Sequence, residues 1–574
     1  MKISKLFPFA CVALMMSACA SDKEEIGSGT KPGSDPQYLA VNIVNVGATP
    51  TTRAAEYVNG TAEESAIKKV RFYFFNGDGS PYLIKNPGIP GVEGGGEKNW
   101  LEASPAVDSS TSGTPSQTEE KITQTVLVIN GIQSAAPAAI VAIVNPETVD
   151  AATLKNGGTM RLSELRYSAV GRNFYKKDAD NGAVSEFVMS NSVYVNAGED
   201  VCASLVAGHV TTSAETAKTK PVDLYVERVV AKVTADVDKT AFERGNGTNW
   251  EANKYGTKNP VGKSGDYDVY AVIEGWGLAN ENGKAEVEKQ VDKTWTDGTL
   301  GFTPWTTADY HRCFWETSVA FDAGVGANPP VNPTFNQLKA KMQDVLYTLP
   351  NTPGSKITDL KNNDLTKFAV AATLRYKDAS GNWHNAEICR YNGVSILGID
   401  NLKKQVALTY SQYYTSTDAT NYTQLSKDDI DFKDPDGTMQ QYRVTPTLAN
   451  DPAGTKKYYT KTTTGTTPTF REVNKADVLA AIEEDKAEIR RDGRAYYYVP
   501  IKHIGGLGEL AEYGIVRNHF YKITLTGIKG FGTPVYDPDK VVDPIVPTYE
   551  NTYLAARVQV LQWRVVNQNA SLGD

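Results

Sequence analysis

The first residue with chemistry of its own is Cys19. A positively charged start is followed by an apolar run, residues 6–16, about as long as the core of a signal peptide and too short to span a membrane. A lipoprotein signal peptidase needs small side chains just before a lipidated cysteine, because its cleavage slot excludes bulk, and Ser17 and Ala18 supply them. We therefore expect Cys19 to become the lipid-bearing first residue after removal of residues 1–18. The alternative is an ordinary signal peptide with an incidental cysteine.

A second candidate for chemistry is Arg53, which stands alone among small side chains. It is the one arginine in residues 47–55, GATPTTRAA. Exposed segments of small residues are where proteases enter a folded protein. We therefore predict cleavage between Arg53 and Ala54, which would make residues 19–53 a propeptide.

Other residue types that could do chemistry lack the necessary spacing. The five histidines are dispersed, and none lies in a metal-binding pattern such as HExxH. The acidic run from Asp434 suggests a calcium loop, but Phe432 and Arg443 stand where an EF-hand needs acidic ligands. Gly506 and Gly508 are not followed by an acidic residue that could bind a ribose. We therefore predict no catalytic residue, no metal and no cofactor.

Composition favours a large all-β protein. A chain of 574 residues exceeds what one hydrophobic core usually serves, so we expect two domains. Its 30 Tyr, 48 Gly and 28 Pro favour strands and turns. A net charge of -8 provides no basic field for phosphate groups, so nucleic acid is not an expected partner. Cys202, Cys313 and Cys389 form neither a disulfide framework nor a CxxC pair, and we expect them to be small buried apolar residues.

The element that would give cleavage at Arg53 a consequence is the strand before it. Residues 38–46, YLAVNIVNV, alternate so that Leu39, Val41 and Ile43 share one face. A strand that precedes a cleavable loop can leave the fold after cleavage. Its departure would leave unpaired backbone edges and an apolar groove, both costly to expose. We predict that these three residues form the apolar face of a removable strand.

A similar strand ends the chain. The segment 533–551 contains four prolines and is predicted to be an extended linker, and a strand over residues 553–566 follows it. Tyr553-Leu554-Ala555 repeats the Tyr38-Leu39-Ala40 with which the first strand begins. We predict that this strand refills the groove of another copy by β-strand addition, in a head-to-tail contact that propagates. The predicted donor residues are Tyr553, Leu554, Ala556, Val558, Val560 and Trp563.

Between the two ends, alternating apolar segments predict further strands, among them VRFYFF, AAIVAIV and FYKITLTGI. A helix is predicted over residues 476–490, and a short one within 151–167. The run 222–237 is predicted to leave one domain and enter the next. The predicted division is a signal peptide at 1–18, a lipidated propeptide with the removable strand at 19–53, β-sandwiches at 54–230 and 231–533, and a spacer with the donor strand at 534–574.

Several segments together resemble a known family. They include the lipobox at Cys19, the strand and arginine up to Arg53, VERVVAKV, YTLPNT, GIVRNHFYKITLTGIKGFG and the terminal VQVLQWRVVNQ. The chain resembles the fimbrillins of the Bacteroidales, most closely the Mfa-type shaft subunits of minor fimbriae. The resemblance spans nearly the whole mature chain and implies two tandem transthyretin-like β-sandwiches with a C-terminal donor-strand extension and minor helices.

The resemblance also implies a biological role. A shaft subunit is exported as an outer-membrane lipoprotein, with transient membrane anchoring by its lipid, and is cleaved by an Arg-specific surface protease. It then polymerises by strand exchange into a cell-surface fimbria that serves adhesion and biofilm formation. The implied partners are other copies of the chain, fimbrial tip and anchor subunits, and host or bacterial surface receptors.

Two other kinds of function remain as alternatives. One is a monomeric surface adhesin or glycan-binding lipoprotein, for which Trp100, Trp250, Trp295 and Trp305 in aromatic-rich loops could stack on sugars. The other is a cell-surface hydrolase, for which the sequence offers no credible carboxylate pair or nucleophile.

Overall fold

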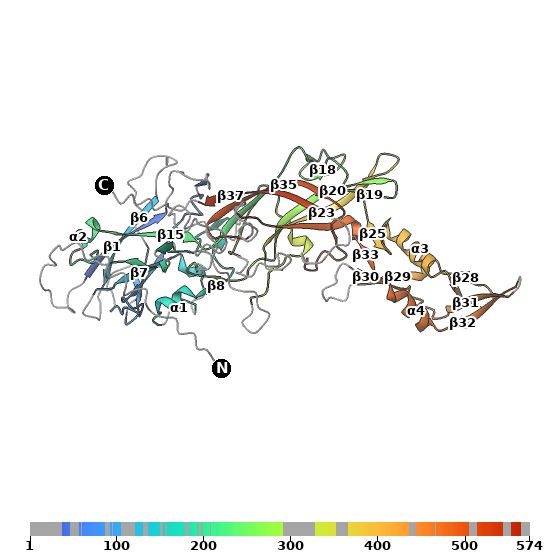
Figure 1. Cartoon of the computed structure of the whole chain (residues 1–574), viewed down its shortest axis with the longest axis horizontal. Helices are drawn as coiled ribbons and strands as arrows, with labels where there is room; N and C mark the ends of the chain where they lie inside the picture. Colours follow the sequence, from blue (N-terminus) through green and yellow to red (C-terminus); the bar gives the residue numbers. More distant parts are fainter. Residues whose placement is uncertain are drawn as a thin grey trace.

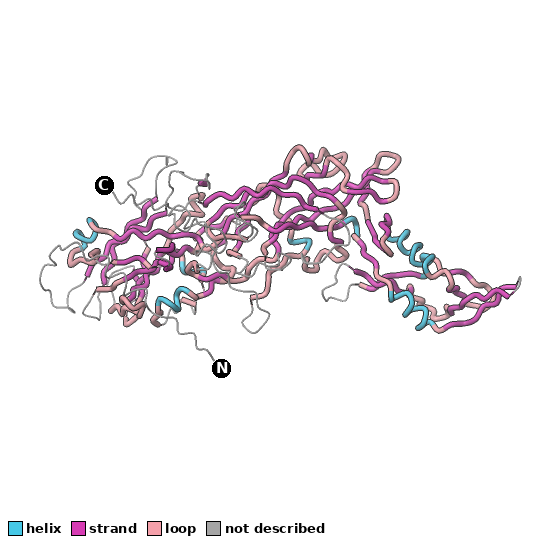
Figure 2. Tube along the Cα trace, viewed as in Figure 1, coloured by secondary structure: helices cyan, strands magenta, loops and turns pink. Residues whose placement is uncertain are grey.

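The protein is an elongated chain of β-sheets with a few short helices at their margins in the computed structural model (Figure 1, Figure 2). The structure describes residues 37–45, 57–58, 60–85, 92–94, 96–104, 121–129, 136–149, 153–154, 158–177, 183–191, 194–196, 199–201, 203–206, 208–290, 328–351, 365–434, 443–464, 467–503, 514–542 and 553–563.

Among these residues, the N-terminal part is built on a nine-stranded sheet. Its strands, in spatial order, are β4 (Val92–Gly94), β5 (Trp100–Ala103), β3 (Val70–Phe75), β7 (Ala139–Val144), β11 (Met189–Asn191), β15 (Val222–Arg228), β1 (Gln37–Asn45) and β6 (Lys121–Ile129), with β14 (Ser204–Leu205) beside β7. The first half of β15 pairs with β1 and its last three residues pair with β11. Strand β15 therefore joins the two layers of this sandwich.

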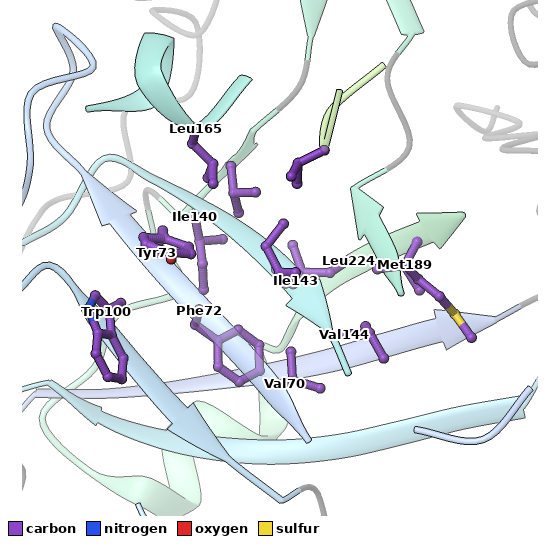
Figure 3. Close-up of a cluster of buried hydrophobic side chains, with 14 of the residues drawn as sticks. Val70, Phe72, Tyr73, Trp100, Ile140, Ile143, Val144, Leu165, Met189 and Leu224 are labelled. Atoms are coloured by element: carbon purple, nitrogen blue, oxygen red, sulfur yellow. The ribbon is translucent and has the colours of Figure 1, made fainter. Parts of the chain in front are cut away.

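The N-terminal core lies between these layers. Strands β3 and β7 are buried along their whole length, as expected for the near-continuous apolar runs VRFYFF and AIVAIV. Figure 3 shows Phe72, Ile140 and Ile143 from these strands packed near Leu224 of β15. The same core contains Leu39 and Val41 of β1, so the first strand is part of the sandwich.

The C-terminal part is a sandwich of two sheets that share one core. The five-stranded sheet has the order β2 (Tyr57–Val58), β37 (Tyr553–Trp563), β35 (His519–Lys529), β16 (Ala231–Val237) and β22 (Val345–Thr348). The eight-stranded sheet has the order β17 (Phe242–Arg244), β18 (Tyr255–Thr257), β20 (Tyr267–Ala279), β23 (Lys367–Lys377), β34 (Arg494–Pro500) and β36 (Thr533–Pro534), with β19 (Gly262–Ser264) beside β20 and β24 (Trp383–Asn385) beside β23.

A separate module with its own core is inserted between β24 and β34, at the end of the molecule farthest from the N-terminal sheet (Figure 1). One sheet contains β26 (Val394–Leu397), β25 (Ile388–Tyr391), β33 (Ala487–Ile489), β30 (Arg443–Leu448) and β29 (Ile430–Lys433). The outermost sheet contains β28 (Thr423–Gln424), β27 (Tyr413–Ser416), β31 (Lys457–Thr464) and β32 (Thr467–Val473). Helices α3 (Ile399–Thr409) and α4 (Lys475–Glu484) supply apolar residues to the module's core.

The remaining elements are small. Two short helices, α1 (Leu162–Arg166) and α2 (Ala214–Thr219), flank the N-terminal sandwich. The short strand pairs are β8 (Ala169–Val170) with β21 (Ala285–Glu286), β9 (Lys176–Lys177) with β10 (Val184–Ser185), and β12 (Tyr194–Asn196) with β13 (Glu199–Val201). Within the described residues, no helix is long and apolar enough to cross a membrane.

The all-β sandwich class predicted from the sequence is confirmed. The run 222–237 divides into β15 and β16, which lie in sheets of the N-terminal and C-terminal parts. The predicted helix over 476–490 is shorter: α4 ends at Glu484, and residues 487–489 form β33 instead. The inserted module, which lies inside the predicted 231–533 domain, was not predicted; the domain boundaries themselves stay a prediction.

Candidate strand-exchange site

Strand β1 lies inside a sheet, with partners on both sides. It pairs antiparallel with β6 along all nine of its residues. On its other side, Val41–Val44 pair in parallel with Val222–Tyr225 of β15. The side chains of Leu39 and Val41 are fully buried. Strand β1 is therefore bound through backbone hydrogen bonds on two edges and through the apolar face predicted from its alternation.

The neighbours of β1 define what its removal would leave behind. Strand β6 is the last strand of its sheet and has β1 as its strand partner among the described residues. Loss of β1 would create a slot with the edge of β15 on one side and the edge of β6 on the other. An incoming strand could then form ladder hydrogen bonds on both of its edges.

The C-terminal strand β37 lies in a sheet of its own chain. It pairs antiparallel with β35 from Tyr553, opposite Lys529, to Gln562, opposite His519. On its other edge, the described residues that pair with it are Tyr57 and Val58 of β2, which run parallel to it. The predicted strand is thus present, and it ends at Trp563.

The register of β37 places the middle of the strand opposite buried residues of β35. Ala556, Val558 and Val560 lie directly opposite Leu525, Ile523 and Tyr521 of β35, and those three partners are buried. Residues directly opposite in an antiparallel pair project to the same face of the sheet. Within its own chain, the middle of β37 is therefore paired through its backbone with a core strand of the C-terminal sandwich.

The proline-rich segment before β37 differs from its prediction. Thr533 and Pro534 form β36 against β34, and Val535 and Val542 are buried in a small core with Phe335. This first part of the predicted linker is packed against the C-terminal sandwich, because its valines are apolar enough to be buried despite the flanking prolines. Residues 543–552 are what separates the packed segment from β37.

A polar network fixes the chain just after β2. The turn around Glu64 is closed by reciprocal bonds, in which the Thr61 N–H donates to Glu64 Oε2 at 2.8 Å and the Glu64 N–H donates to Thr61 Oγ1 at 3.2 Å. Lys232 of β16 forms a buried ion pair with Glu64 at 2.7 Å, and the hydroxyl of Tyr347 on β22 donates to the same carboxylate. Glu64 therefore binds two strands of the sheet that contains β37.

Arg228 extends this network to β35. Its Nε donates to the backbone oxygen of Glu64 at 2.8 Å, and its guanidinium also donates to Ser65 Oγ and to Asn518 Oδ1, next to the start of β35. Burial, which disfavours the charged form, lowers the pKa of Arg228 to about 10. Burial acts to raise the pKa of Glu64, but the bonds from Lys232 and Tyr347 outweigh it and lower that pKa.

Sequence reasoning did not assign these network residues a role. The charged residues Arg228 and Lys232 did stand out, because they interrupt the apolar run 222–237. Their partner Glu64 lies more than 160 positions earlier in the chain, and no local pattern connects the two segments.

Several predicted site residues lie outside the described residues: Cys19, Arg53 and Ala54, and the side chains of Ile43, Tyr553, Leu554, Ala556, Val558, Val560 and Trp563. The cleavage site and the lipid attachment therefore stay predictions. Cys389 is buried as predicted, and burial raises the pKa of its thiol, while Cys202 and Cys313 also lie outside this set.

The tryptophans considered for glycan stacking are corrected by the structure. Trp100 is 5% exposed and Trp250 is 3% exposed. The ring of Trp250 packs against that of Trp383. The guanidinium of Arg71 covers the ring of Trp100 at 4.2 Å from its centroid. These two rings cannot stack on a sugar in this conformation, and Trp295 and Trp305 lie outside the described residues.

Aromatic residues that the sequence did not single out gather on the outermost sheet. The rings of Tyr422 and Phe470 stack with centroids 4.0 Å apart, and Tyr414 and Tyr459 contact them edge-on. These ring contacts join Tyr422, just before β28, to residues of β27, β31 and β32, and they stabilise the sheet. Among the described residues, no group of three His, Cys, Asp or Glu side chains is placed to hold a metal ion.

The fold and these two strands define an all-β sandwich protein in which both the first and the last described strands are built into sheets. Residues 490–569 match the family described as major fimbrial subunit protein type IV, fimbrillin, C-terminal. The matched region contains β34, β35, β36 and β37. This match confirms the resemblance to the fimbrillin family over the C-terminal segment of the chain.

Several solved structures are similar to the chain. A "putative cell adhesion protein" from Parabacteroides distasonis has 13% identity and a TM-score of 0.34, over 92% of this chain and 97% of that one. The tip fimbrial protein Mfa3 from Porphyromonas gingivalis, with C-terminal truncation, has 10% identity and a TM-score of 0.29, over 92% and 100%. A fimbrial assembly protein from P. distasonis has 9% identity and a TM-score of 0.24, over 61% and 84%. No curated protein matches the chain by sequence.

Proposed function

We propose that this chain is a structural shaft subunit of a bacterial surface fimbria, and not an enzyme, that polymerises by exchange of its terminal strands. It is exported as a lipoprotein through Cys19 and cleaved after Arg53, and it then loses β1. The C-terminal strand of another copy enters the slot between β15 and β6. The observation that carries the proposal is the position of β1, which is buried between two strands and followed by a segment with a single arginine.

The sequence of β37 fits the slot that β1 occupies. If Tyr553-Leu554-Ala555 takes the place of Tyr38-Leu39-Ala40, then Leu554, Ala556 and Val558 take the places of Leu39, Val41 and Ile43. Leu39 and Val41 are the core-facing residues of β1, so the donor presents its apolar face to the same core. Burial of apolar side chains such as Leu554 and Val558 at about 1.5–3 kcal/mol each supports slow dissociation.

The pairing on each edge favours exchange. In its own chain, β37 has one long partner and a two-residue partner. In the slot it would take the partners of β1, which is paired with β6 over nine residues and with β15 over four. The exchanged arrangement therefore gives the donor a strand partner on both edges, and it closes two strand edges that cleavage leaves open.

The length of chain that can reach outward is limited. Because Val542 is packed against the sandwich, residues 543–552 are the segment that must extend. Ten residues span at most about 33–36 Å when fully extended. A donor therefore reaches a slot adjacent to its own sandwich, which fits a head-to-tail shaft with close subunit contacts.

The test of this proposal is a pair of variants. In Arg53→Ala the propeptide should remain attached and the protein should stay monomeric after treatment with an Arg-specific protease. Deletion of residues 553–574 should permit cleavage but abolish fibres. N-terminal sequencing of wild-type fibres should begin at Ala54. Normal fibres from both variants would contradict the proposal.

A glycan-binding monomer is the competing function, with two of its four candidate tryptophans buried. It predicts glycan-array binding by protein that never polymerises, and the same purified wild-type protein can be used for both measurements.

A further inference from the structure

The segment from β2 to the Glu64 turn, residues 57–65, runs across one end of the sheet that contains β37; we call it the strap. Tyr57 and Val58 pair with Gln562 and Trp563, the last residues of β37. Gln562 in turn lies opposite His519, the first residue of β35.

The far end of the strap reaches the same end of the sheet. Lys232, which binds Glu64, lies opposite Phe520 of β35 and opposite Tyr347 of β22. The strap therefore passes from the outer edge of β37 to β16 and β22, over the end where β37 finishes and β35 begins.

In the uncleaved chain the strap is bound at its C-terminal end and tethered through the backbone at its N-terminal end. Its C-terminal end is fixed by the ion pair from Glu64 to Lys232 and by the bonds from Arg228 to Glu64 and Ser65. Its N-terminal end continues through residues 46–56 to β1, which is paired on both edges in the N-terminal sandwich. The predicted cleavage site, Arg53, lies within that connection.

The strap determines whether β37 has a free edge. With β2 in place, the end of β37 is paired on both sides, by β35 and by β2, and so it cannot pair with another subunit there. A segment fixed at both ends re-forms its pairing quickly after each opening, because its ends stay close to their partners. A segment fixed at one end opens more often and for longer.

We propose that the strap holds the C-terminal strand in its own chain until cleavage at Arg53 releases the N-terminal end of the strap. This inference rests on the proposed function and adds a second role for the same cleavage. One cut opens the slot that accepts a strand and also loosens the strand that is donated. A subunit that is still attached to its propeptide can therefore neither accept a strand nor donate one.

The test is a reversible cross-link in the full-chain precursor. Tyr57→Cys with Gln562→Cys joins β2 to β37 at directly opposed positions. After treatment with an Arg-specific protease, the oxidised variant should have a new N-terminus at Ala54 but should form fibres only after a reductant is added. The matched control is Thr462→Cys with Thr469→Cys, an exposed opposed pair on the outermost hairpin, which should form fibres with or without reductant.

A second measurement does not depend on disulfide formation. In the wild type, amide hydrogen exchange over residues 556–563 should accelerate at least about tenfold on cleavage. In uncleaved Val58→Pro, which removes a backbone N–H from β2, the same amides should accelerate while those of β1 stay protected.

The outcomes separate this inference from the proposed function. The proposed role of the strap would be wrong if cleaved protein with an intact cross-link formed fibres. It would also be wrong if cleavage left the amide hydrogen exchange of β37 unchanged. If either result occurs while deletion of residues 553–574 still abolishes fibres, only the proposed role of the strap is wrong and the proposed function stands. Fibres from that deletion variant would overturn both.

Discussion

Strands β1 and β37 begin with the same three residues and alternate in the same way, yet they are bound very differently. β1 is paired with β6 over nine residues and with β15 over four, whereas β37 is paired with β35 over ten and, among the described residues, with β2 over two. The strand with the longer pairing on its second edge belongs to the predicted propeptide. The difference indicates that β1, which the chain is proposed to lose, lies between two strands of its sheet. Strand β37, which the chain is proposed to donate, pairs mainly with β35.

The largest expected effect comes from placing a charge on the donor face. Val558→Asp would bury a carboxylate in the place of Ile43, and an unpaired buried charge costs several kcal/mol. Cleaved Val558→Asp should accept a wild-type donor but fail to donate, so it should terminate fibres when mixed with wild-type protein. Fibre length by electron microscopy measures this.

The control for that experiment is Gln559→Asp on the opposite face of β37. Gln559 lies opposite Lys522, so an aspartate there is placed near a positive charge. Fibres should form normally. Equal inhibition by both variants would mean that the two faces of β37 are not distinguished by the slot.

The next largest effect is a loss of stability that is expected in the precursor but not in the fibre. Leu39 is fully buried in β1, and Leu39→Ala should lower the free energy of unfolding of the precursor by about 2–5 kcal/mol. The fibre should be unaffected, because β1 has been removed from it. Urea unfolding of both forms measures the difference.

Val345→Ala, at a position 38% exposed, is the matched control and should change either form by less than about 0.5 kcal/mol. A fibre destabilised by Leu39→Ala would show that β1 stays in place after assembly.

A smaller effect concerns the network that fixes the strap. Glu64→Gln should lower the free energy of unfolding at pH 7 by about 2 kcal/mol, a typical value for hydrogen bonds to a charged group. The pKa of Glu64 is lowered in the folded state, so its contribution is complete above the unfolded-state pKa of about 4.5 and is lost as pH falls through the folded-state pKa. The difference between variant and wild type should therefore shrink in acid.

Chemical denaturation at a series of pH values measures the difference in unfolding free energy between Glu64→Gln and the wild type. The control is Glu215→Gln, in an exposed pair with Lys218, for which little effect is expected. A difference that grows as pH falls would contradict the assigned charge state.

The smallest expected effect is a gain in the stability of the fibre. Ala556 would occupy the place of Val41 and leave part of its volume unfilled. Ala556→Val should stabilise the fibre by about 1 kcal/mol, or slow its dissociation by about fivefold. Dissociation in denaturant measures it. Faster dissociation would show that Ala556 does not take the place of Val41.

Much of the strand content and the apolar faces could be predicted from the sequence, because alternation at period two is a local property. Leu39 and Val41 were placed on the buried side of β1, and β15 and β16 were placed at the passage between sheets. The helix α4 was predicted but extended too far, because Ala487 and Ile489 continue its apolar pattern, while pairing with β25 makes residues 487–489 a strand.

The sequence by itself determined that both ends of the chain carry matching strands and that one arginine follows the first. Only the tertiary structure decided what each strand pairs with: β1 between β6 and β15, β37 between β35 and β2, and Glu64 on Lys232. The physical reason is that alternation defines a face but not a neighbour. Neighbours depend on edges contributed by segments hundreds of residues apart, which meet only when the sheets are complete.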